Sequence, residues 1–313
     1  MGIATRMILA AALLLLPTAV LADPYADAVP GENPATPTAP PPSAVPEAPT
    51  DRGLRWKNAA VIGGIAATVG IYGATNWWED GFSGSFHIEN EGWFGQNTYE
   101  GGADKAGHAY FTYTTTRLLT RAFEAVGNDP GRALRLGTWT ALGVLTGVEV
   151  IDGFSKKFSF SMEDMVMNTA GAAFAVLSEV VPSVDALLDF RLLYQRPDDA
   201  QQAGATNPAS DYSGQTFLLV LKADGIPRVR EVPVLRYLEF EVGYNARGYE
   251  ANDGTLNDPE RRICFGVGIN LSRLLSDTVF RCDLKGGKIQ RGTDTVLEFL
   301  EVPWTAARTY RTF

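Results

Sequence analysis

The sequence predicts an α+β protein, in which an up-and-down bundle of about four to five apolar helices precedes a small antiparallel β-rich C-terminal region. Two observations carry this prediction. Long apolar stretches between residues 58 and 181 are separated by turn and capping signals. After residue 213 the hydrophobic pattern changes to alternation with a period of two, as in YLEFEVGYNA and ICFGVGINL.

The overall charge restricts the partners of the chain. The formal net charge is −9 over 313 residues, which argues against nucleic acid because phosphate backbones need Lys and Arg. The same charge disfavours electrostatic docking on anionic lipid. A membrane or envelope lipid, if it is a partner, would be contacted through apolar and aromatic residues, and the sequence does not identify a protein partner.

Residues 1–22 have the pattern of a cleaved signal peptide. Arg6 supplies the positive start, residues 7–16 form an apolar stretch too short to span a bilayer, and Ala22 fits the small-residue cleavage rule. The alternative is an uncleaved anchor. Cleavage would expose Asp23 as the new N-terminus, with no lipid-attachment cysteine nearby, and export predicts a periplasmic or envelope-membrane-associated protein.

Five segments follow from composition. After the signal peptide, residues 23–50 form a Pro-rich disordered linker with eight prolines from position 30 to 49. We expect the helical bundle with its polar site at 51–195, a linker at 196–213 and the β-rich region at 214–313.

The first helical segment, Asn58–Trp78, carries no charge across 21 residues. Its length is enough to cross a bilayer, but its many Gly and Ala residues also suit close packing in a core. Both interpretations stay open. The aromatic, Gly-rich loop at 79–101 that follows could be a lid over a pocket, a wedge into lipid, or a loop packed on its own aromatic residues.

Four further helices are predicted from periodicity, caps and turns. A capping box at Ser161 and Asp164 marks one start, and Pro182 marks the stop of the same helix. The predicted ranges are 104–126, 131–152, 162–181 and 184–194.

Strands are predicted at 216–222 and in the two alternating runs. In the first run Phe240 and Val242 alternate with Glu239 and Glu241, so we expect the apolar side chains to be buried on one face. Residues 271–280 are predicted to be helical, and 295–302 are ambiguous. Cys264 and Cys282 could form a disulfide or remain two separate thiols.

Polar residues at the ends of three apolar helices are the candidate functional site. They are Asp104, Lys105 and His108, then Glu149 and Asp152, then Asp164 and Asn168. The first group opens its helix, the second closes the next, and the third opens the one after. If consecutive helices run antiparallel, all three groups lie at one pole of the bundle.

The chemistry of this pole stays open between binding and catalysis. Glu149 and Asp152 oppose the helix dipole in a last turn, so a cation should compensate them. A divalent metal could bind through His108, Glu149, Asp152 and Asp164, although a single histidine is poor for zinc. For catalysis, His108 would be the general base with Glu149 or Asp152 as its partner. For binding, Asp104, Lys105, Asp164 and Asn168 would contribute.

The runs DKAGH, EVIDGFS and FSMEDMVMNTAG resemble the YfiM-type family of periplasmic lipoproteins, a domain of unknown function. The pattern is more distantly similar to VanZ-like membrane proteins. The resemblance implies a recurring polar constellation and brings no established activity.

These observations indicate an exported and membrane-associated cell-envelope protein with a polar binding or structural site. The alternative is a hydrolase or transferase acting on envelope lipid or glycan. Whether the chain is an enzyme is left undecided, because no G-x-S-x-G motif or reactive cysteine accompanies His108.

Overall fold

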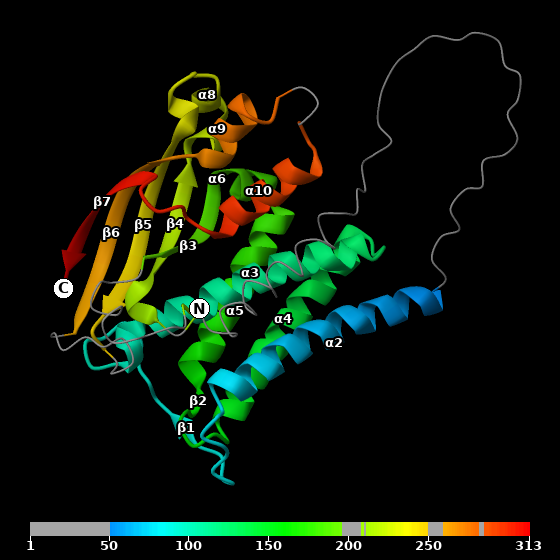
Figure 1. The fold of residues 1–313 in the computed structure, drawn as a ribbon, viewed down its shortest axis with the longest axis vertical. Coiled ribbons are helices and arrows are strands. Elements are labelled where there is room, and N and C mark those ends of the chain that lie inside the picture. The colour runs from blue at the N-terminus through cyan, green and yellow to red at the C-terminus, as the bar shows by residue number, and fades with distance from the viewer. Residues whose placement is uncertain (1–50, 196–207, 210, 250–258, 282–284) are drawn as a thin grey trace, which may run out of the picture.

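The computed structural model describes residues 51–195, 208–209, 211–249, 259–281 and 285–313. The predicted signal peptide, the Pro-rich linker, most of the 196–213 connection and Cys282 lie outside the described residues. Helices precede a five-stranded antiparallel sheet (Figure 1), which confirms the predicted α+β class. The predicted segment boundaries remain predictions.

Four long helices occupy the N-terminal part: α2 (Asp51–Asn76), α3 (Ala103–Ala125), α4 (Pro130–Asp152) and α5 (Met162–Val180). The last three agree with the predicted ranges to within one or two residues, and for α4 and α5 local capping explains why. The Asp129 side chain accepts a hydrogen bond from the amide of Arg132, and the Ser161 side chain accepts one from the amide of Asp164. These caps fix where α4 and α5 begin.

Helix α3 packs against both α4 and α5, and glycines allow the close approach. A Cβ added at Gly171 of α5 would lie 2.1 Å from the carbonyl oxygen of Ala109 in α3. One added at Gly137 of α4 would lie 2.5 Å from Oγ1 of Thr120. Neither position leaves room for a side chain, so the backbones meet directly at both crossings.

Helix α2 lies on the surface beside α4 and is not a buried core helix (Figure 1). Asn58 bonds Asn128 just before α4 begins, and Trp78 bonds Asp152 at its end, so α2 and α4 run in the same direction. Residues 52–76 and helix α4 are long and apolar enough to cross a membrane, and only 17% and 22% of their most apolar windows are buried. By the same test, the core helix of a soluble protein would also pass.

The sheet has the order β3-β4-β5-β6-β7, with every neighbouring pair antiparallel. Its strands are β3 (Leu188–Tyr194), β4 (Gln215–Lys222), β5 (Leu238–Arg247), β6 (Glu260–Ile269) and β7 (Ala306–Thr312). The accompanying shorter helices are α6 (Pro182–Leu187), α8 (Pro227–Arg230), α9 (Leu271–Thr278) and α10 (Lys288–Phe299).

The helix predicted at 184–194 is wrong. Helix α6 ends at Leu187, and β3 takes the remaining residues because Asp189, Arg191 and Leu193 alternate inward along a strand. The predicted helix at 271–280 is confirmed by α9, and the ambiguous segment at 295–302 begins as the end of α10.

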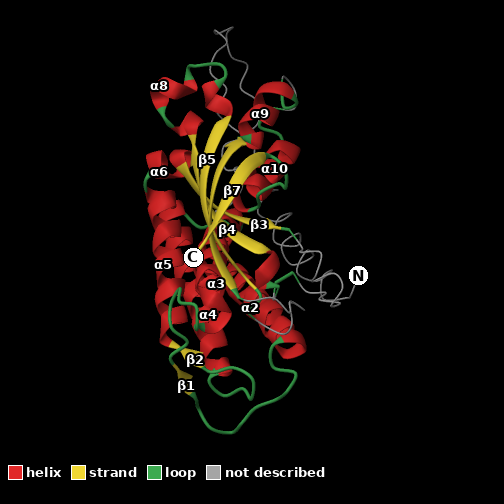
Figure 2. Cartoon of the chain, turned by 90° about the vertical axis from the view of Figure 1, so that its left-hand side faces the viewer, coloured by secondary structure: helices red, strands yellow, loops and turns green. Residues whose placement is uncertain are grey.

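A two-stranded parallel sheet ties the 79–101 loop to the start of α5. It consists of β1 (Ile88–Glu89) and β2 (Phe160–Ser161). Figure 2 shows this pair at the opposite end of the molecule from α8 and α9. The loop is therefore attached at the pole where the polar helix ends lie.

The face of the sheet that is buried is the opposite of the one predicted. Glu239 and Glu241 are 1% and 2% exposed, whereas Phe240 and Val242 are 49% and 51% exposed. Phe265 on β6 is likewise exposed. Hydrophobic alternation alone indicates that the two faces differ, but it does not say which face is covered.

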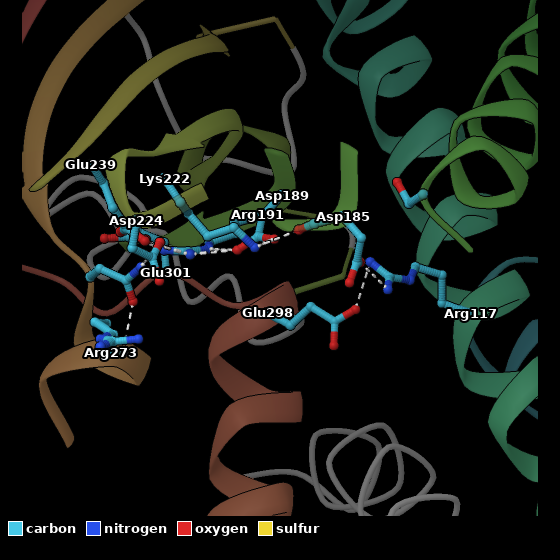
Figure 3. Close-up of polar contacts among 12 residues, drawn as sticks. Arg117, Asp185, Asp189, Arg191, Lys222, Asp224, Glu239, Arg273, Glu298 and Glu301 are labelled. Atoms are coloured by element: carbon cyan, nitrogen blue, oxygen red, sulfur yellow. Dashed lines mark hydrogen bonds and ion pairs between the residues drawn. The ribbon is translucent and has the colours of Figure 1, made fainter. Parts of the chain in front are cut away.

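Buried ion pairs explain the reversal (Figure 3). Arg191 contacts Asp189, Glu239 and Glu301 at 2.5, 2.8 and 3.1 Å. Arg308 on β7 contacts both Glu241 and Glu301. Leu300, next to Glu301, also bridges to edge strand β3, so the segment after α10 crosses this face and links residues of both edge strands through Glu301.

Helix α3 crosses part of the outward apolar face. Tyr110 of α3 packs against Phe190 and Phe217, with ring centroids 5.5 and 5.9 Å apart. Tyr113 stacks on Phe174 of α5 nearby. Helix α3 thereby joins the sheet to the other helices and carries its own first turn into the candidate site.

Candidate functional site

The polar ends of α3, α4 and α5 meet, as the sequence predicts. Nδ1 of His108 lies 3.6 Å from Oε1 of Glu149, and its Nε2 lies 3.6 Å from Oδ1 of Asp104 and 3.9 Å from Oδ2 of Asp164. The two carboxylates that open helices suit the positive end of the dipole, whereas Glu149 opposes it at a helix end. His108 is the group that the three helix ends share.

Lys105 ties α3 to α5 and to the preceding loop. Its Nζ lies 3.0 Å from Oδ2 of Asp104 and 2.8 Å from Oδ1 of Asp164, and it also donates to Glu91. The Lys105 side chain is fully buried. It therefore holds one oxygen of each aspartate, while the other oxygen of each faces His108.

Asn168 fixes the orientation of the histidine ring. Its Oδ1 lies 3.2 Å from Nδ1 of His108 and accepts a hydrogen bond of 2.8 Å from the Thr112 hydroxyl. Among the described residues, its buried Nδ2 has no hydrogen-bond partner. With Nδ1 directed at Asn168 and Glu149, Nε2 is directed at the two aspartates.

Asp152 is separate from the group around His108. Its Oδ1 accepts a hydrogen bond of 2.6 Å from the indole of Trp78, and among the described residues it makes no ion pair with His108, whereas Glu149 does. The pairing of His108 with an acid at the end of α4 therefore falls to Glu149. Asp152 sits beyond it, towards α2.

The carboxylates outnumber the cations, and burial makes the excess costly. Burial raises the pKa of Glu149 to about 8, that of Glu91 to about 7 and that of Asp152 to about 6. Burial also raises the pKa of Asp164, with the nearby charge of Asp104 adding to the effect. The site accommodates its negative charge by favouring protonated carboxyls.

Three groups in the site are held in their charged forms. Burial alone would lower the pKa of His108, but Asp104, Asp164 and Glu149 outweigh it and raise the value to about 9. Burial would likewise lower the pKa of Lys105, but the charges of Asp104 and Asp164 outweigh this effect and raise it. For Asp104 burial is outweighed by His108 and Lys105, so its pKa is lowered.

Two site residues were missed by the sequence analysis. Glu91 comes from the 79–101 loop and reaches Lys105, while Tyr212 donates a hydrogen bond of 2.5 Å to Oδ1 of Asp104. Tyr212 lies over 100 residues from Asp104 in the chain. No local spacing rule connects it to the helix ends, because Tyr212 belongs to the predicted 196–213 connection, whose described C-terminal end reaches the site.

A comparison with known protein families finds a match to the part of the chain that contains helices α3, α4 and α5. Residues 90–180 match a family described as predicted periplasmic lipoprotein (DUF2279). Most of the site lies in the segment that matches DUF2279. That segment contains Glu91 and all seven predicted site residues, and it ends with helix α5.

The DUF2279 description agrees with export to the periplasm or envelope, and it assigns no activity. Neither cysteine of the chain falls within the DUF2279 segment. Cys264 is a free, buried thiol in β6. No curated protein and no solved structure matches the chain.

Proposed function

We propose that this protein is a membrane-associated envelope protein whose site at the ends of α3, α4 and α5 binds a divalent cation. The observation that carries the proposal is the convergence of Asp104, His108 and Asp164. One ligand atom from each lies within 4.8 Å of the others. A cation placed among them would neutralise the carboxylate excess that burial makes unfavourable.

The orientation of the three side chains supports this role. Nε2 of His108 and the two oxygens that face it, Oδ1 of Asp104 and Oδ2 of Asp164, would be the ligands. Nδ1 is held from behind by Asn168 and Glu149, which is the arrangement that orients histidine ligands in metal sites. One nitrogen and several oxygens suit Mn²⁺ better than Zn²⁺.

The alternative, an enzyme with His108 as general base, has less support. With its pKa raised to about 9, the His108 imidazole is protonated at neutral pH and cannot accept a proton. The side chain is also only 18% exposed. A hydrolase or transferase role would require a ligand that first removes the proton from His108.

The proposal is tested by metal binding to chelator-treated full-length protein. We expect calorimetry to detect Mn²⁺ binding that releases protons and that strengthens as the pH rises from 6 to 8, because the cation displaces the His108 proton. Asp104→Asn and Asp164→Asn should each weaken binding at least tenfold.

Asp152→Asn is the matched control, since Asp152 is turned towards Trp78 and should leave binding unchanged. If the wild-type protein binds neither Mn²⁺ nor Zn²⁺ at millimolar concentration, the network is purely structural and the proposal fails. Equal loss in all three variants would also contradict the ligand assignment.

A further inference from the structure

An apolar groove of about 880 Å³ runs along the surface between α2 and α4. Helix α2 lines one side with Ile62, Ala66 and Val69, and α4 lines the other from Arg132 to Ile151. These α4 residues span roughly 28 Å by helical rise. The groove is therefore long, and its lining is mostly apolar.

Glycines create the open floor of the groove. Gly143 and Gly147 of α4 and Gly70 of α2 line it, and a Cβ added at any of them would meet no atom within 4 Å. Trp139 stands on its wall and is 72% exposed. An exposed apolar channel of this kind marks a binding surface for an apolar ligand.

The two ends of the groove differ in charge. Arg132 and Arg135 line the end where α4 begins. Because α2 runs in the same direction as α4, its first turns bring Arg52 and Lys57 to the same end. At the other end Trp78 closes the groove, with its indole donating to Asp152.

We propose that this groove binds an acyl chain of an anionic phospholipid, with Arg132 and Arg135 at the phosphate. The apolar length exceeds the depth of one bilayer leaflet, about 15 Å, so an extended chain fits along it. The basic end complements a phosphate, and the amide of Arg132 is already bonded to Asp129, which leaves the side chains as phosphate ligands.

This inference is independent of the cation site and revises the expectation from net charge. The formal charge of −9 belongs to the whole chain, whereas the groove mouth is locally basic. Attraction to a phosphate depends on the charges within about a Debye length of it, about 8 Å at physiological salt. Electrostatic contact with anionic lipid is therefore compatible with an acidic protein.

The test is binding of dioctanoyl phosphatidylglycerol, kept below its micelle concentration, to the full-length protein. We expect the double variant Gly143→Leu/Gly147→Leu to weaken binding at least tenfold, because leucine side chains would fill the floor. Leucine has a higher helix propensity than glycine, so α4 should remain folded. The double variant Gly63→Leu/Gly64→Leu is the control, since these α2 glycines also face open space but do not line the groove.

The headgroup assignment has its own test. Arg132→Gln/Arg135→Gln should lose most of the preference for dioctanoyl phosphatidylglycerol over dioctanoyl phosphatidylcholine while keeping binding of both. Equal affinity for the two lipids in the wild-type protein would overturn the role of the arginines.

Sedimentation of the wild-type protein separates lipid from a second copy of the chain. A monomer that binds lipid supports the proposal. A dimer that fails to bind lipid, and that the groove-filling variant converts to monomer, would assign the groove to self-association and overturn it. Unchanged lipid binding in the groove-filling variant would overturn it as well.

Discussion

His108 and Glu149 show how burial and charge compete within one contact. The imidazole is held protonated chiefly by Asp104 and Asp164, while burial keeps Glu149 close to its neutral form despite the imidazole 3.6 Å away. The sequence correctly predicted that an acid at the end of α4 needs compensation. It could not say that protonation would supply part of it, because the degree of burial depends on packing that no spacing rule describes.

Glu149→Gln should stabilise the chelator-treated protein at neutral and alkaline pH. The folded-state pKa of Glu149, about 8, lies above the ordinary glutamate value of 4.5, so the stability that the neutral Glu149 carboxyl contributes is complete below about pH 4.5 and is lost as the pH rises through 8. Glutamine does not titrate, so the advantage of the variant should grow between pH 5 and 8, to the order of 3 kcal/mol. Urea denaturation across this pH range measures it.

Glu89→Gln is the control for this series, because the Glu89 side chain is exposed and outside the site. A Glu149→Gln variant that is less stable than wild type at pH 8 would mean that Glu149 is ionised and paired with His108. The buried carboxyl would then be an ionised partner of His108 and not a neutral, protonated group.

At the scale of elements, caps and turns were enough to place α3, α4 and α5. Strand β3 was missed because the short apolar run LDFRLLY fits the end of a helix as well as a strand. It forms a strand because it pairs with β4, which is distant in the sequence. The meeting of the polar residues could be predicted from the three helices alone, because the start of α3, the end of α4 and the start of α5 lie together if consecutive helices alternate in direction. Glu91 and Tyr212 escaped prediction because Glu91 comes from the 79–101 loop and Tyr212 from the 196–213 connection.

Gly171→Ala should destabilise the protein by roughly 1–3 kcal/mol or more, because the added Cβ would collide with the backbone of α3 at Ala109. The sign is diagnostic, since glycine-to-alanine changes within a helix normally stabilise by up to about 1 kcal/mol. Gly147→Ala, which meets no atom within 4 Å, is the control and should raise the melting temperature.

Thermal unfolding followed by circular dichroism distinguishes the two alanine variants. A Gly171→Ala protein as stable as Gly147→Ala would show that α3 and α5 can separate without cost. The crossing would then not be what holds His108 against Asp164.

At the scale of the whole molecule, α3 joins a helical part to a sheet with a charged interior. The leader-like start predicted a location in the periplasm or envelope, in agreement with the family description. Which side of the sheet would be covered could not be predicted, because both strand faces are regular. The covered face is determined by ion-pair partners that are distant in the sequence, such as Glu301, which lies 110 residues from Arg191.

The reversed sheet also determines which substitutions the protein should tolerate. Along β5, replacing Phe240 or Val242 by threonine alters side chains already in contact with solvent, so cellular abundance should change little. Replacing Glu239 by leucine removes an acceptor of the buried Arg191 and should cost about 3–5 kcal/mol. In a library of single variants, mutational sensitivity along this strand should peak at the glutamates, so a hydropathy plot would rank the vulnerable positions in reverse.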